Sequence, residues 1–145
     1  MVSLKEIKSD RKVEAEGEWI EAPEVGFKDD GTPVRLLVRS LHYPPYKMDL
    51  MQTRMRLQRK YPGDKMVPPD EEDRENGRIY AQHLLLGWDG IAEEYSPELA
   101  METLKDPAQR ILREAVPACA RLVGQRRTEQ TEALVGNLKP ASIGN

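Results

Sequence analysis

The stretch Val34-Arg35-Leu36-Leu37-Val38-Arg39-Ser40-Leu41 decides the fold class, because apolar and basic residues alternate along it. Successive side chains of a β-strand point to opposite faces of the sheet. Val34, Leu36 and Val38 would therefore share one buried face, and the residues between them would form a partly basic outer face. The pattern predicts a β-strand that is covered on one side.

A second strand and a turn precede this stretch. Glu18-Trp19-Ile20-Glu21 is strand-like, and Asp29-Asp30-Gly31-Thr32 is a turn signal. Residues 17–43 are therefore predicted to form a β-hairpin, which needs helices to cover its apolar face. Residues 1–16 are charged and poor in large apolar side chains, so we expect them to form a flexible arm.

Two helices are predicted next. Pro44-Pro45 ends the strand and suits a helix start, and the helix is expected to reach Lys60, before the break at Pro62-Gly63. A run of four acids from Asp70 complements the positive end of a helix dipole, and this second helix is expected to continue to Trp88.

Capping residues predict two further helices. Ser96-Pro97-Glu98 combines a cap, a first-turn proline and an acid, and Asp106-Pro107-Ala108-Gln109 has the pattern of a capping box. Pro117 is expected to kink the last of these helices. Its apolar stripe consists of Ile111, Leu112, Ala115, Val116, Cys119, Leu122 and Val123.

These elements predict an α+β protein, mainly α, in which an N-terminal β-hairpin precedes four or five helices of a small helical domain. The single domain is expected to span residues 17–135, with helices in 44–135 and a weak last helix at its end. Residues 136–145 have little to bury and are expected to form a flexible tail. A chain of 145 residues suits one domain.

Composition and residue types argue against several functions. A net charge of -3 gives no attraction for nucleic acid or anionic membranes, and no apolar run approaches the roughly 20 residues of a membrane span. His42 and His83 lack paired metal-ligand spacing, and Cys119 lies in the apolar stripe, where burial raises the pKa of a thiol. We therefore expect a cytoplasmic protein without enzymatic activity, cofactor or metal.

The row Met48, Met51 and Met55 has two interpretations. Methionine fills gaps in cores, which is its commoner role, and it also makes adaptable surfaces for partner proteins. The three residues are the candidates for partner binding.

Several motifs occur in an order typical of one phage family. Gly87-Trp88-Asp89-Gly90-Ile91 is followed by Tyr95-Ser96-Pro97-Glu98-Leu99-Ala100 and by Asp106-Pro107, and Trp19 lies upstream before a turn. The chain from about residue 17 to 123 resembles the tail assembly chaperones of long-tailed, siphovirus-like bacteriophages. In that family a helix ends at Trp-x-Gly-Ile or Val, and a Tyr/Phe-Ser-x-Glu start leads into a short helix.

These motif residues have a structural interpretation. Gly90 is expected to take the left-handed conformation that ends a helix, while Trp88 and Ile91 pin the turn to the core. The residues predicted to shape the fold are Trp19, Trp88, Gly90, Ile91, Tyr95, Ser96, Asp106 and Pro107.

The resemblance implies a chaperone that acts in the host bacterial cytoplasm and is absent from the mature virion. It would bind and solubilise the tape measure protein and recruit tail tube subunits, and self-association is left open. The alternative is a structural virion component, such as a tail completion or head-tail connector protein. Presence in purified particles separates the two.

Overall fold

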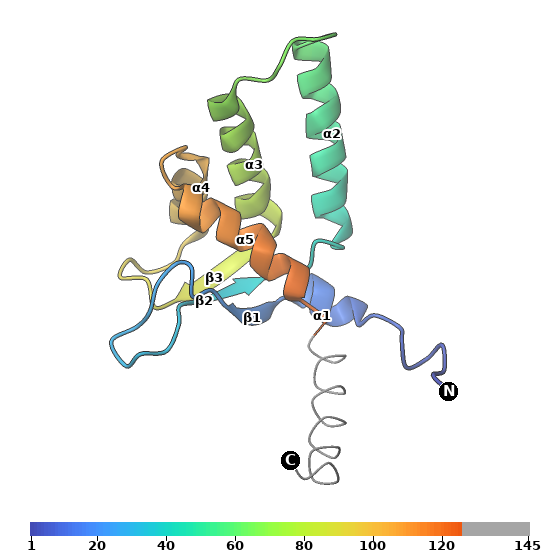
Figure 1. Ribbon diagram of the computed structural model, residues 1–145, viewed down its shortest axis with the longest axis vertical. Coiled ribbons are helices and arrows are strands. Elements are labelled where there is room, and N and C mark those ends of the chain that lie inside the picture. Colours follow the sequence, from blue (N-terminus) through green and yellow to red (C-terminus); the bar gives the residue numbers. More distant parts are fainter. Residues whose placement is uncertain (126–145) are drawn as a thin grey trace, which may run out of the picture.

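The computed structural model describes residues 1–125, which form helices around one small sheet (Figure 1). In chain order, the elements are α1 (Arg11–Glu16), β1 (Glu18–Glu21), β2 (Arg35–Val38), α2 (Pro44–Lys60), α3 (Pro69–His83), β3 (Leu85–Asp89), α4 (Pro97–Lys105) and α5 (Arg110–Leu122). The predicted fold class is confirmed: the protein is α+β, mainly helical, and has two N-terminal strands. The predictions for the tail and for most of the weak last helix lie outside the described residues.

The strands form one antiparallel sheet in the order β1-β2-β3. The central strand and the residue before it have the predicted alternation, since Val34, Leu36 and Val38 are each 3% exposed or less. Leu36 pairs with Ile20 of β1 on one side and with Trp88 of β3 on the other. The inner face of the sheet is therefore apolar, as the sequence predicts.

The prediction that the second helix continues to Trp88 is wrong. The helix ends at His83, and Leu85–Asp89 form the third strand. A short apolar run such as Leu85–Asp89 has no periodicity that distinguishes a helix from a strand. The hydrogen bonds with β2 make it a strand, and the local sequence does not reveal that pairing. Gly90 has the expected left-handed backbone, with φ +99°, but it follows a strand rather than a helix.

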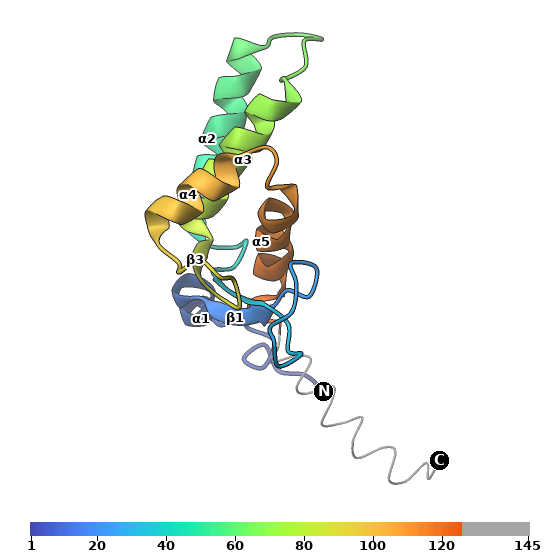
Figure 2. The same ribbon diagram turned by 90° about the vertical axis from the view of Figure 1, so that its left-hand side faces the viewer.

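The core lies between the sheet and the helices α3, α4 and α5 (Figure 2). Its largest fully buried apolar side chains are Leu36, Val38, Ile79, Leu84, Leu85, Leu104, Val116 and Cys119. Most of the predicted α5 stripe is buried, but Ile111 and Leu122 are exposed. Helix α5 runs through Pro117.

The connection between α4 and α5 corrects another prediction. Ser96 caps α4 as expected, because its Oγ accepts a hydrogen bond from the Leu99 amide at 3.0 Å. Asp106, however, ends α4 instead of starting α5, so the predicted capping box is wrong. The Gln109 amide donates to the Asp106 carbonyl at 3.0 Å, which closes a turn through Pro107, and α5 begins only at Arg110.

Part of the expected N-terminal arm is helical. Asp10 caps α1 by accepting hydrogen bonds from two following amides, and Glu14 within α1 is buried. The Ser40 amide and the Arg39 guanidinium donate to the carbonyls of Glu14 and Ala15, at 3.0 and 2.7 Å. These bonds hold α1 against the segment after β2. The composition of residues 1–16 does not reveal such contacts with a distant part of the chain.

Candidate functional site

Helix α2 stands beside α3 and away from the sheet, and polar side chains join the two helices (Figure 1). Asp49 lies at the centre of this seam. The Arg78 guanidinium donates to both Asp49 carboxylate oxygens at 3.0 Å, and Thr53 Oγ1 donates to one of them at 3.0 Å. His83 Nε2 lies 2.8 Å from the other. The hydrogen bonds from Arg78, above all, hold the pKa of Asp49 well below its usual range.

Further ion pairs extend the seam toward the far ends of the helices. Arg56 of α2 contacts Glu75 of α3 at 2.6 Å, and Lys60 contacts Glu71 at 2.5 Å. Tyr61 also donates a hydrogen bond to Glu71. These pairs lie on the side of α2 that faces α3, and exposed pairs of this kind contribute little stability.

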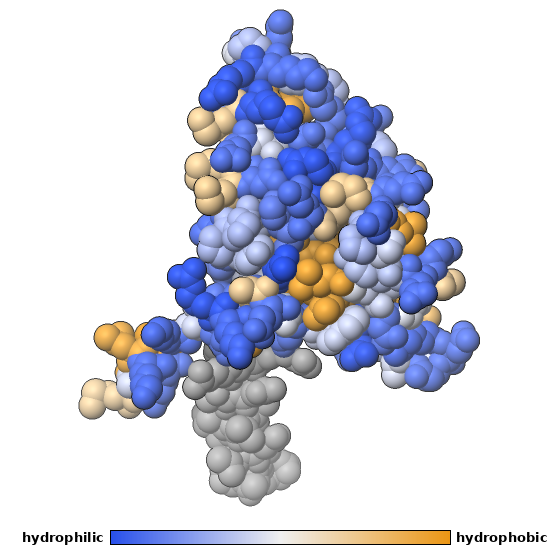
Figure 3. All heavy atoms as spheres, turned by 180° about the vertical axis from the view of Figure 1, so that it is seen from behind, coloured by the Kyte–Doolittle hydropathy of each residue, from blue (hydrophilic) through white to orange (hydrophobic). Residues whose placement is uncertain are grey.

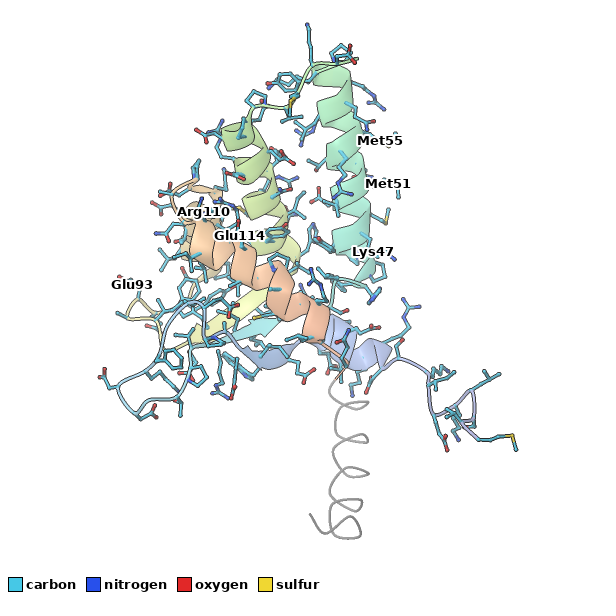
Figure 4. All side chains as sticks on the ribbon, in the orientation of Figure 1. Lys47, Met51, Met55, Glu93, Arg110 and Glu114 are labelled. Atoms are coloured by element: carbon cyan, nitrogen blue, oxygen red, sulfur yellow. The ribbon has the colours of Figure 1, made fainter. Side chains whose placement is uncertain are left out.

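The opposite side of α2 carries a groove of about 460 Å³. Its lining consists of Leu41, Tyr46, Lys47, Leu50, Met51, Arg54, Met55 and Gln58. Figure 4 shows Lys47, Met51 and Met55 in a row along the side of α2 that points away from α3. The groove is mostly apolar, and Met51 and Met55 are 64% and 47% exposed.

The structure separates the three predicted methionines. Met51 and Met55 line the groove together, whereas Met48, 61% exposed, lines a different hollow beside His42 and Pro44. None of the three fills the core, so the core interpretation of this row is wrong. The sequence analysis did not single out the other groove residues. Helical spacing could have found two of them, because Lys47 lies four residues before Met51 and Arg54 lies three residues after it, on the same side of the helix.

Two cations and no acid line the groove. Lys47 and Arg54 are exposed, and within residues 1–125 neither makes a salt bridge. The positive field of Arg54 reaches Tyr46, where it opposes the rise in pKa that burial causes. The groove is therefore an apolar strip with an uncompensated basic rim.

The predicted motif residues line a second hollow, of about 600 Å³, at the end of the sheet. Trp88, Gly90 and Ile91 meet the exposed side chains of Phe27 and Ile111 there. The surface seen from behind is mostly hydrophilic, with its largest apolar area near the centre and smaller ones toward the edges (Figure 3).

The remaining motif residues have structural contacts. The Tyr95 ring packs edge-on against Trp88, with centroids 5.1 Å apart, and its hydroxyl donates to the Leu85 carbonyl at 3.1 Å. Trp19 is partly exposed, and the Arg35 guanidinium lies 5.1 Å from its ring. Tyr95 therefore contacts β3 at both Leu85 and Trp88, and the role of the whole motif in shaping the fold stays a prediction.

Groups capable of catalysis do not gather at the groove. Within the described residues, no three His, Cys, Asp or Glu side chains form a potential metal site. Cys119 is buried in the core, and burial raises its pKa to about 12. In the same part of the chain, no helix has the length and apolar character needed to cross a bilayer.

Comparison with known proteins identifies a family. The model of the YdaY prophage protein family matches residues 41–137, which include α2 to α5 and the whole groove and leave the β1–β2 hairpin outside. Searches of curated proteins and of solved structures found no match. The family match covers more than half of the 145 residues. The chain therefore belongs to the YdaY prophage protein family and is of bacteriophage origin.

Proposed function

We propose that this phage protein is a tail assembly chaperone that binds and solubilises the tape measure protein and recruits tail tube subunits. The observation that carries the proposal is the exposed apolar groove along α2, with Met51 and Met55 at its surface. The identity of the partners rests on the resemblance of the sequence to tail assembly chaperones. The phage origin of the family is consistent with it.

A groove along a helix suits a helical partner. An amphipathic helix binds such a groove through apolar residues that recur every three or four positions. Met51 and Met55 have unbranched, polarizable side chains, which adapt to different apolar sequences along a long partner. One groove of this size binds weakly, so many copies along one tape measure chain would supply the overall affinity.

The surface outside the groove suits a solubilising coat. Charged residues make up 32% of the sequence, and the face of the molecule seen from behind is mostly hydrophilic (Figure 3). A copy that covers an apolar stripe of the partner replaces that stripe with a charged surface. In this proposal the protein acts in the host cytoplasm without cofactor or catalysis and leaves before the virion is complete.

The test is co-expression with the tape measure protein of the same prophage, followed by measurement of soluble yield and co-purification. Met51→Glu places a charge in the groove and should reduce the co-purified tape measure protein at least tenfold. Met48→Glu is the matched control, because Met48 is equally exposed on the same helix but lies outside the groove. It should leave binding unchanged.

Either of two results would contradict the proposal. A tape measure protein that stays insoluble and unbound with the wild-type chain excludes the chaperone function, and the chain should then be sought in purified particles as a virion component. Equal losses with Met48→Glu and Met51→Glu would show that the groove is not the binding site.

A further inference from the structure

We infer that the α2 groove selects a partner helix whose apolar stripe is flanked by acidic residues about seven positions apart. This inference rests on the proposed function and specifies the chemistry of the partner segment. It is carried by the charge of the lining, in which Lys47 and Arg54 are the ionised side chains and no carboxylate is present.

Four of the five cations of α2 fall into two groups, and Arg59 lies outside both the groove and the ion pairs with α3. Arg56 and Lys60 face α3 and are paired with Glu75 and Glu71. Lys47 and Arg54 face the groove and make no ion pair within residues 1–125. Arg56 and Lys60 thus have a role in the contact between α2 and α3. Lys47 and Arg54 have no such role in the fold.

The spacing of the two groove cations sets the spacing expected in the partner. Lys47 and Arg54 are seven residues apart, which is two helical turns and roughly 10 Å along the axis. Met51 lies between them, on the same side of α2. A helix lying along this groove places its apolar residues on the methionines and residues seven positions apart beside the two cations.

The charge of the basic rim is opposite in sign to the net charge of the whole chain. The chain has a net charge of -3, which disfavours acidic partners at long range. Attraction between an acidic partner and Lys47 or Arg54 outweighs this repulsion only within a Debye length, which is roughly 10 Å at 0.1 M salt. The selectivity should therefore fall as the salt concentration rises.

The test uses two synthetic 18-residue helical peptides with the same leucine stripe. One carries glutamates and the other lysines at flanking positions seven residues apart. Calorimetric titration into the full chain should give about tenfold tighter binding of the glutamate peptide at 50 mM salt, as expected for two exposed ion pairs. The difference should become smaller at 300 mM salt.

A charge-reversal variant tests whether the groove is responsible. The double variant Lys47→Glu and Arg54→Glu should reverse the preference. Arg59→Glu with Lys65→Glu changes the net charge equally at exposed positions outside the groove and should keep the wild-type preference. Circular dichroism of each variant checks that the fold is retained.

The outcomes separate this inference from the proposed function. Equal binding of both peptides, or reversal in the control variant, overturns the charge selectivity while co-purification of the tape measure protein still supports the chaperone. If neither peptide binds but the tape measure protein co-purifies, the inference fails alone. If nothing binds, both fail.

Discussion

Gly77 provides the sharpest test of the packing, because the backbone of α4 leaves no room for a side chain at this position of α3. A methyl group on Gly77 would lie 1.8 Å from the Leu104 carbonyl oxygen and 2.9 Å from the Lys105 amide nitrogen. Both atoms belong to the backbone, so no side-chain rotation relieves the overlap. The variant Gly77→Ala therefore requires the two helices to separate.

The size of the effect follows from this geometry. Carbon atoms in contact lie roughly 3.5 Å from their neighbours, so relief of the 1.8 Å contact requires a separation of about 1.7 Å. Such overpacking of a core typically costs 1–3 kcal/mol, and a rigid backbone obstacle places Gly77→Ala near the upper value, about 3 kcal/mol. Alanine favours the helix by about 1 kcal/mol over glycine, which leaves a net loss of about 2 kcal/mol.

Urea and thermal unfolding of the wild type and Gly77→Ala measure this difference. At this chain length, a net loss of about 2 kcal/mol corresponds to a fall in Tm of roughly 4–8 °C. Helix propensity alone predicts the opposite sign, a stabilisation. An unchanged or higher Tm would therefore show that α3 and α4 do not pack as closely as described.

Two further predictions concern ionisable groups. Because the folded protein holds the pKa of Asp49 below its ordinary value of 3.8, the carboxylate stabilises the fold above that value, and the free energy of unfolding should fall as the pH drops below about 4. Urea titrations between pH 6 and 2.5 should show a smaller fall for Asp49→Asn; identical slopes would exclude this role. The Cys119 pKa, raised from 9.0 to about 12, leaves about a thousandfold less thiolate at pH 8 than an ordinary thiol has. A thiol reagent should therefore label Cys119 only after unfolding, and labelling of the native protein at an ordinary rate would contradict its burial.

The sequence predicts those helices and strands that are determined by their own residues. The alternation around Leu36 predicts β2, and Ser96 predicts the start of α4. The strand at Leu85–Asp89 is missed because its partner is β2, about 50 residues earlier. Asp106 is misassigned because its carbonyl closes a turn that the capping pattern does not describe.

The candidate site is only partly predictable for the same reason. Helical spacing places Met48, Met51 and Met55 on one face of α2, but the sequence alone does not show which face of the helix meets α3. That orientation is set by Asp49, whose partner Arg78 lies 29 residues away. Once this pair is known, the groove side follows from the helical period.

The polar character of the α2–α3 seam bears directly on function. The apolar contact between α2 and α3 includes the rings of Tyr46 and Tyr80, whose centroids lie 6.4 Å apart. Beside it, Asp49, Arg78 and Thr53 hold α2 in one orientation through directional hydrogen bonds. The exposed side chains of Met51 and Met55 are then unnecessary for the fold, and their exposure is unfavourable in water. In the proposed function, a partner helix that covers Met51 and Met55 removes this exposure.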